Sequence, residues 1–214
     1  MTKLDILYED NHIIVVFKPA GILSQADKSG DVDMLTIIKS YLKEKYNKPG
    51  NVYLGLVHRL DRPVSGIMVF AKTSKAASRL SKEIRNNKMH KKYLAIIHGY
   101  LDVKEGTLVN RIEKLDNKKV LIDTPKGKKA VLNYKVIKEK NNLSLVDINL
   151  VTGRYHQIRL QFASINHPLY GDYLYNKKDT NKLALVCYSL SFIHPTTKEN
   201  MNFNLKNTEN YIKL

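Results

Sequence analysis

The stretch VHRLDRPVSGIMVFAKT, residues 57–73, joins a charged turn to an apolar run and organises the sequence around it. Pro63 and Gly66 predict a turn, and the run from Gly66 to Lys72 predicts a buried strand. Another strand candidate, VYLGLV at residues 52–57, comes just before the turn. We therefore expect a loop held at both ends, and reactive side chains commonly lie on such loops.

Helical patterns occur at three places in the chain. Apolar spacing predicts a helix over residues 33–46, capped by Asp33, and a second over about 73–86, capped by Thr73 or Ser74. A third helix is predicted over residues 154–165. Its apolar stripe consists of Tyr155, Ile158, Phe162 and Ile165.

Strand patterns fill most of the remaining sequence. They fall at residues 12–17, 91–99, 107–113, 118–123, 129–137, 143–151, 183–193 and 201–205. No repeat or long linker divides the chain. We expect an α+β fold, a single domain over residues 1–214 with a large mixed, mostly antiparallel sheet flanked by helices.

The charge balance favours a polyanionic partner. Lys and Arg number 36 against 20 Asp and Glu, which gives a formal net charge of +16. Such a field attracts nucleic acid. A chain with lysine on every surface would show the same excess, so charge alone does not separate the two explanations.

Cysteine and histidine usage argues against disulfides and metal sites. Cys187 is the one cysteine, which excludes an intramolecular disulfide and indicates a reducing cytoplasm. The seven histidines lack zinc-site spacing, so no metal site is expected. Acids interrupt the N-terminal stretch, and no later apolar run is long enough for a membrane span. Walker, GxSxG, HExxH and GxGxxG motifs do not occur.

Asp61 lies between Arg59 and Arg62 in the charged turn. A carboxylate acts as a nucleophile or base only while ionised, and neighbouring guanidinium groups favour that form in a partly buried loop. Asp61 is therefore the first candidate for a catalytic group. For an isolated HRLD sequence, a structural Asp–Arg pair that holds the turn is the alternative.

Two arginines lie in TGRYHQIR, residues 152–159. Arg154 projects onto the apolar stripe of the predicted helix, and Arg159 lies at its edge. A guanidinium directed toward a core needs a partner, because an unpaired buried charge is strongly destabilising. Asp61 is a natural partner for either one. Alternatively, both side chains extend to solvent.

Tyr93 lies in HKKYLA, residues 90–95, directly after a basic patch. An aromatic ring beside cations suits an unstacked base, since stacking contributes about 1–3 kcal/mol per base. The chain has 13 tyrosines, however. Taken alone, Tyr93 is better explained as a core or cross-strand residue.

Together, in this order, the three segments resemble the RluA-type pseudouridine synthases. The motifs that carry the resemblance are HRLDRPVSG at 58–66, KKY at 91–93 and TGRYHQIR at 152–159. Supporting matches are FKPAG at 17–21, KKAVLNYKV at 128–136 and HPLYGD at 167–172. The resemblance covers roughly residues 6–194 and implies the family's catalytic domain.

This resemblance implies an RNA pseudouridine synthase that isomerises uridine in structured ribosomal or transfer RNA without a cofactor. Asp61 would be the catalytic aspartate, acting as a nucleophile on the flipped uridine or as a base at the ribose. Tyr93 would stack on the uracil. Arg159 would pair with Asp61, with Arg154 as a competitor for that role.

The resemblance also implies contacts with RNA around the reacting nucleotide. Arg59 would fill the space that the flipped uridine leaves. Further RNA contacts are expected from His58, Arg154, Lys72, Lys91 and Lys92. The expected partner is RNA, with no membrane and no small-molecule cofactor, for a monomer in the cytoplasm.

The chain departs from the family pattern at a few positions. Pro63 and Val64 stand where many members have an acidic or small residue followed by Thr, and Gln161 stands near a common His. The chain begins close to its first motif, so target choice is expected to depend on the catalytic domain's own surface.

A catalytically inactive RNA-binding or RNA-chaperone protein on the same fold is the main alternative. It would have the same charge and fold. The presence of Asp61 together with Tyr93 and the arginine pair favours the enzyme. A glycosylase or nuclease is a weaker candidate, because the second acid or metal ligands that activate water are missing.

Overall fold

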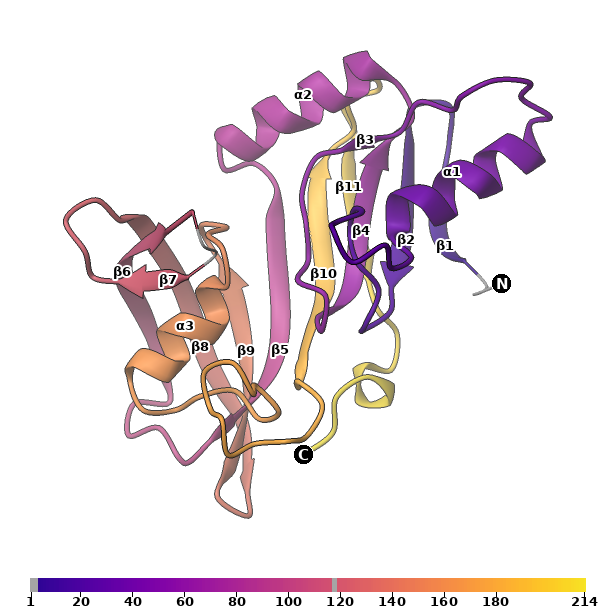
Figure 1. The fold of residues 1–214 in the computed structure, drawn as a ribbon. Coiled ribbons are helices and arrows are strands. Elements are labelled where there is room, and N and C mark those ends of the chain that lie inside the picture. Colours follow the sequence, from indigo (N-terminus) through magenta and orange to yellow (C-terminus); the bar gives the residue numbers. More distant parts are fainter. Residues whose placement is uncertain (1–3, 117–118) are drawn as a thin grey trace. The chain divides into compact units, whose positions relative to one another are not determined.

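The computed structural model describes residues 4–116 and 119–214 (Figure 1). These residues form three α-helices, eleven strands and a short 3-10 helix at Thr208–Asn210. The predicted α+β class with a large, mostly antiparallel sheet is confirmed. None of the helices in the described ranges is long and apolar enough to cross a membrane.

The chain divides into two compact units. The first comprises Met1–Met89 and Ser189–Leu205, and the second comprises His90–Tyr188 and Lys206–Leu214. Strand β10, Leu185–Ile193, passes from the second unit into the first. A single domain over residues 1–214 stays a prediction.

The first unit is built around two buried strands. Its elements are β1 (Asp5–Glu9), β2 (Ile13–Lys18), α1 (Met34–Lys45), β3 (Gly55–Leu56), β4 (Ser65–Ala71), α2 (Ser74–Arg85) and β11 (Asn200–Asn204). Strand β2 pairs antiparallel with β1 and β4, and β3 also pairs with β4. The apolar side chains of β2 and β4 are almost all buried, which accounts for their nearly continuous apolar sequences.

Both predicted helix caps in this unit are confirmed. The Asp33 carboxylate accepts a hydrogen bond from the Thr36 amide at 3.2 Å, and the Thr73 hydroxyl accepts one from the Ala76 amide at 3.1 Å. Tyr46, the last residue of the predicted range 33–46, lies outside α1. It follows the helix, is 44% exposed and donates its hydroxyl to Glu9.

The second unit is an antiparallel sheet covered by one helix. Its elements are β5 (His90–His98), β6 (Glu105–Lys114), β7 (Val120–Ile122), β8 (Lys128–Lys140), β9 (Leu143–Leu150) and α3 (Gln157–Ser164). The strand order is β5-β9-β8-β6-β7. Leu160 of α3 packs with Ile112 of β6 and Ala130 of β8, so α3 lies over this part of the sheet (Figure 1).

The third helix is shorter than the predicted range of 154–165. Helix α3 begins at Gln157, because His156 has φ 52 and ψ 24, a left-handed backbone that a right-handed helix cannot include. Arg154 and Tyr155 therefore precede the helix, and the expected projection of Arg154 onto its apolar stripe is wrong. Arg154 is exposed instead.

Some strand boundaries also differ from the prediction. Strand β1 was not expected, since its acids interrupt the apolar pattern, and only Gly55–Leu56 of residues 52–57 is strand. The strand predicted at 118–123 is observed as Val120–Ile122, and Lys118 lies outside the described residues.

Candidate active site

Asp61 lies in the first unit, on the loop that leads into β4. The Ser24 hydroxyl donates to the Leu60 carbonyl at 2.7 Å and accepts from the Leu60 amide at 3.1 Å. The Val64 amide donates to the Asp61 carbonyl at 3.0 Å, closing a turn. Both flanks of Asp61 are therefore held, and its side chain is half-buried.

Lys18 is a buried cation that contacts this loop and that sequence reasoning did not single out. Its side chain is fully buried, and its ammonium donates to the carbonyls of Pro19 at 3.0 Å, Ile22 at 2.7 Å and Arg62 at 3.2 Å. Burial lowers the pKa of Lys18 to about 8, and the negative charge of Asp61 acts against this shift. The signal was the FKPAG motif, where a lysine ends a buried apolar strand.

The arginines that flank Asp61 in sequence differ in their surroundings. Arg62 forms a salt bridge with Asp31 at 2.8 Å, and its Nε donates to the Gly21 carbonyl at 3.1 Å. The Gly21 amide in turn donates to the Arg62 carbonyl at 2.8 Å. Arg62 thus ties the loop to the turn after β2. Arg59 is exposed, as a residue that contacts RNA must be.

His58 is buried, and its ring fastens the start of the loop to β4. Its Nε2 accepts a hydrogen bond from the Val69 amide at 3.1 Å. In a neutral imidazole this places the proton on Nδ1. The described contact of His58 is therefore structural.

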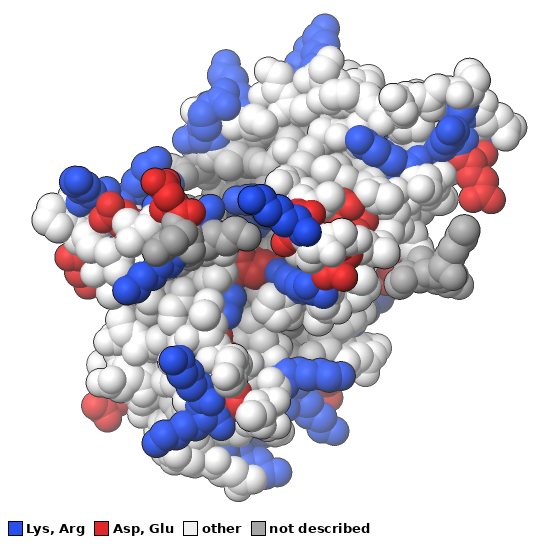
Figure 2. All heavy atoms as spheres, in the orientation of Figure 1, with Lys and Arg blue, Asp and Glu red and all other residues white. Residues whose placement is uncertain are grey.

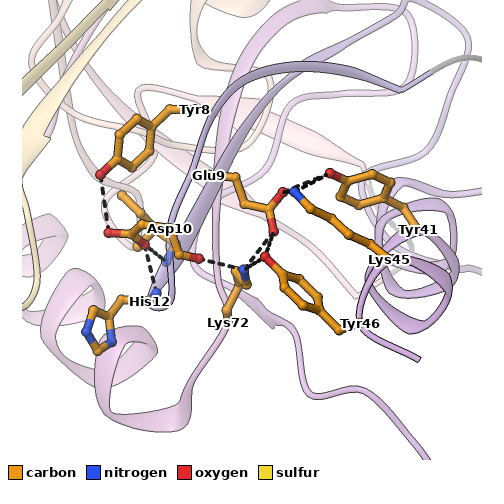
Figure 3. Close-up of polar contacts among 9 residues, drawn as sticks. Tyr8, Glu9, Asp10, His12, Tyr41, Lys45, Tyr46 and Lys72 are labelled. Carbon is orange, nitrogen blue, oxygen red and sulfur yellow. Dashed lines mark hydrogen bonds and ion pairs between the residues drawn. The ribbon is translucent and has the colours of Figure 1, made fainter. Parts of the chain in front are cut away.

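Lys72 is engaged within a polar cluster centred on Glu9, shown in Figure 3. Its ammonium lies 2.7 Å from the Glu9 carboxylate, which also binds Lys45 at 2.8 Å and accepts from Tyr41 and Tyr46. Burial acts to raise the pKa of Glu9, but these hydrogen bonds outweigh it and lower the pKa to about 2. A phosphate would have to compete with this carboxylate for Lys72.

In the second unit, Lys91, Lys92 and Tyr93 lie along β5. Tyr93 is buried, with 5% of its surface exposed, while Lys92 is exposed and Lys91 half-buried. Burial lowers the pKa of Lys91, and the nearby Cys187 acts against that shift. Lys91 and Tyr93 lie two positions apart in the strand and so share a face.

The loop before α3 is locked by the side chain of Gln157. Its Oε1 accepts from the Arg154 amide at 3.0 Å and from the Thr152 hydroxyl at 2.8 Å, while its Nε2 donates to the Val131 carbonyl at 3.1 Å. The Arg154 side chain donates from Nε to the Lys129 carbonyl at 2.9 Å. Gln157, the first residue of α3, therefore fixes the path of the TGRYHQ segment through its side chain.

Arg159 is the buried guanidinium of the second unit. It is 6% exposed, and its Nε and Nη2 each donate to one oxygen of the Asp172 carboxylate at 2.7 Å. Its Cζ also lies 5.3 Å from the ring centroid of Tyr175. Asp172 belongs to the HPLYGD segment, and sequence reasoning missed it as a partner because the two residues are 13 positions apart.

The candidate residues thus occur as two sets. Asp61, Arg59, His58 and Lys72 belong to the first unit. Tyr93, Arg159, Arg154, Lys91 and Lys92 belong to the second. In the first set, hydrogen bonds hold the backbone on both sides of Asp61, and in the second, hydrogen bonds to Asp172 hold the Arg159 guanidinium.

Comparison with known proteins shows the family to which the chain belongs. A sequence model described as "RNA pseudouridylate synthase" matches residues 12–164. The dual-specificity RNA pseudouridine synthase RluA of Haemophilus influenzae is 35% identical over 210 residues, 95% of this chain and 93% of the relative. The chain therefore belongs to the RNA pseudouridylate synthase family, and the resemblance drawn from its motifs is confirmed.

Other similar proteins are longer or more distant. The uncharacterized RNA pseudouridine synthase YhcT of Bacillus subtilis is 37% identical over 204 residues, which is 92% of this chain but 66% of the relative. The chain spans about two thirds of the length of several such relatives. The human RNA pseudouridylate synthase domain containing 4 shares the fold, with a TM-score of 0.78 at 23% identity over 94% of this chain and 88% of that one.

Proposed function

We propose that this chain isomerises uridine to pseudouridine in structured ribosomal or transfer RNA, with Asp61 as the catalytic residue. Membership of the family supports the reaction class. The observation that carries the assignment to Asp61 is its position on a loop whose backbone is held by hydrogen bonds. The negative charge of Asp61 also acts to raise the pKa of the fully buried Lys18.

The reaction exchanges one bond of the nucleoside for another. The N1–C1′ bond breaks, uracil turns within the pocket, and C5 bonds to C1′. The C5 proton is then lost and N1 gains one, so substrate and product are isomers. Asp61 starts the reaction as a nucleophile on the uridine or as a base that removes a proton from the ribose, and both routes fit an ionised carboxylate.

Tyr93 and Arg159 complete the proposed catalytic set. Tyr93 stacks on the uracil. From that position it also helps to remove the C5 proton in the last step. Asp172 engages two of the five N–H groups of the Arg159 guanidinium. Arg159 is the proposed partner of Asp61, with Arg154 as the competitor for that role. The bidentate bond to Asp172 fixes the plane in which Arg159 can orient a second carboxylate.

RNA is held by cations around this set. Arg59 enters the space left by the flipped uridine, and Arg154, Lys91 and Lys92 contact the flanking phosphates. His58 and Lys72 also belong to the proposed RNA-binding set. Their hydrogen bonds to Val69 and Glu9 hold them in place within the protein. Figure 2 shows Lys and Arg side chains spread over the visible face, in line with 36 basic against 20 acidic residues. A monomer in the cytoplasm suits these roles.

The proposal is tested by pseudouridine mapping of total RNA from cells with and without this gene, and from cells that carry Asp61→Asn. The missing modification identifies the substrate. Asp61→Asn should abolish that modification while RNA binding stays near the wild-type level, because the amide keeps the shape but cannot act as a base or nucleophile. Asp5→Asn, at an exposed position of β1, serves as the matched control and should modify RNA normally.

Two outcomes would reject the proposal. Turnover of Asp61→Asn near the wild-type rate would remove the role of Asp61. A wild-type chain that binds RNA but leaves every uridine unchanged would identify the inactive RNA-binding protein considered above.

A further inference from the structure

Tyr155 and His156, just before α3, stack on one another. Their ring centroids are 3.9 Å apart and the planes differ by 18°. Consecutive residues in regular structure point their side chains in different directions, so this stack needs unusual backbone. His156 supplies it with φ 52 and ψ 24. A left-handed backbone is unfavourable for a residue with a side chain, so the surroundings must hold it in place.

The stack is anchored to the buried part of the second unit. The Nδ1 atom of His156 lies 2.9 Å from the Tyr175 hydroxyl, and the two rings meet edge to face at 89°. The Tyr175 ring is covered by Arg159, which Asp172 fixes through two hydrogen bonds. The Tyr155–His156 pair is therefore a rigid aromatic surface, and such preorganisation lowers the entropy cost of binding a ligand.

An exposed cation lies over the Tyr155 ring of this surface. The ammonium of Lys114, an exposed residue at the end of β6, is 4.7 Å from the Tyr155 ring centroid. Tyr155 itself is half-buried, and the exposed Arg154 precedes it. An exposed cation–π contact is weak, so Lys114 can leave the ring and bind a phosphate at little cost.

We propose that Tyr155 is a stacking site for one unpaired base of the substrate RNA, with Lys114 binding the adjoining phosphate. The inference rests on the proposed function only in taking RNA as the ligand. An aromatic ring beside lysine and arginine matches the face and the charge of a single-stranded nucleotide. Tyr155 thereby selects RNA with an unpaired nucleotide near the target.

Binding to a fluorescein-labelled single-stranded RNA of mixed sequence tests the site. All variants carry Asp61→Asn, so that turnover does not change the RNA. Tyr155→Ala should bind about tenfold more weakly, whereas Tyr155→Phe, which keeps the ring, should bind within about twofold of the parent. Lys114→Gln should weaken binding and reduce the slope of log K against log salt by about 0.7.

Matched controls come from the same unit. Tyr173→Ala removes a tyrosine that is 63% exposed, and Lys140→Gln removes an exposed lysine at the end of β8. Neither control should weaken RNA binding as much as the Tyr155→Ala and Lys114→Gln variants do. Cross-linking of wild-type chain to RNA that contains 4-thiouridine, read by mass spectrometry, should give an adduct on Tyr155 or His156. This measurement decides the question if Tyr155→Ala does not fold.

Parental affinity of Tyr155→Ala, or an equal loss in Tyr155→Phe, would overturn the stacking site. Cross-links elsewhere without any on residues 155–156 would do the same. These results are independent of the reaction, which is judged by pseudouridine formation with the wild-type chain. If the binding data reject the Tyr155 site, the proposed function is unaffected. If no pseudouridine forms, the binding data still test the Tyr155 site.

Discussion

Arg159 donates hydrogen bonds to both carboxylate oxygens of Asp172, from Nε to Oδ2 and from Nη2 to Oδ1, each at 2.7 Å. Both side chains are buried. A planar guanidinium held in this bidentate way has one orientation, so the rest of its N–H groups point in a fixed direction. Asp172 is thus a positioning residue for Arg159. The pair also anchors Tyr175 and, through it, His156.

Removal of Asp172 should destabilise the protein strongly. Asp172→Ala leaves the Arg159 charge buried without its main partner, which costs about 3–5 kcal/mol in the free energy of unfolding. Urea unfolding of the two proteins measures this difference. Asp102→Ala, an exposed acid in the same unit, is the control and should stay within about 0.5 kcal/mol of wild type. Equal unfolding midpoints for Asp172→Ala and wild type would contradict the role of the pair.

Lys18→Met should loosen the Asp61 loop. The substitution removes the ammonium that three carbonyls share, including that of Arg62 next to Asp61. Because buried carbonyls without donors are costly, we expect a loss of about 2 kcal/mol in the free energy of unfolding. Pseudouridine formation should fall at least about tenfold. Lys28→Met, at an exposed position, should change neither quantity; full activity in Lys18→Met would show that the loop holds its shape without this residue.

The pH dependence of stability should carry a signature of Lys18. Its pKa is about 8 when folded and 10.5 when unfolded, so between these values the unfolded chain binds more protons. The contribution of Lys18 to the free energy of unfolding therefore rises with pH across that window, by about 1.4 kcal/mol for each unit of pKa lowering. The measurement is the difference between wild type and Lys18→Met in urea unfolding from neutral pH to pH 10. A difference that stays flat would show that the pKa of Lys18 is ordinary.

Glu9 should give a signature of the same sign at low pH, because its pKa is also lower in the folded chain than in the unfolded one. Its folded pKa of about 2 lies below its ordinary value of 4.5, so its stabilising effect is present above pH 4.5 and is lost as the pH falls toward 2. Glu9→Gln should reduce the free energy of unfolding by roughly 2 kcal/mol at neutral pH, and the two proteins should converge near pH 2. The control is Glu44→Gln on the exposed side of α1. A gap between wild type and Glu9→Gln that does not change with pH would exclude a charge-based effect.

Much of the fold followed from local patterns. The caps at Asp33 and Thr73 were predictable because a side-chain oxygen before an amphipathic run satisfies free helix amides within three residues. Strands β2 and β4 were predictable from their continuous apolar runs. The start of α3 was not, since the left-handed His156 is held by Tyr175, which is 19 positions away in the chain.

The candidate site divides in the same way. Motif order alone pointed to Asp61, Tyr93 and the arginine pair as the residues to consider. The pairing of Arg159 with Asp172, the exposure of Arg154 and the burial of Lys18 beside the Asp61 loop came only from the coordinates. Each depends on contacts between segments that no periodicity connects.

The sequence by itself determined the class of fold, the two helix caps, the basic charge and the family to which the chain belongs, because these depend on residue type, local spacing and motif order. Only the tertiary structure decided which carboxylate Arg159 grips, which carbonyls hold Lys18, and that Tyr155 stacks on His156. The physical reason is that a buried charge or a strained backbone is stabilised by whichever distant groups folding brings within hydrogen-bond range. Those partners have no fixed separation along the chain.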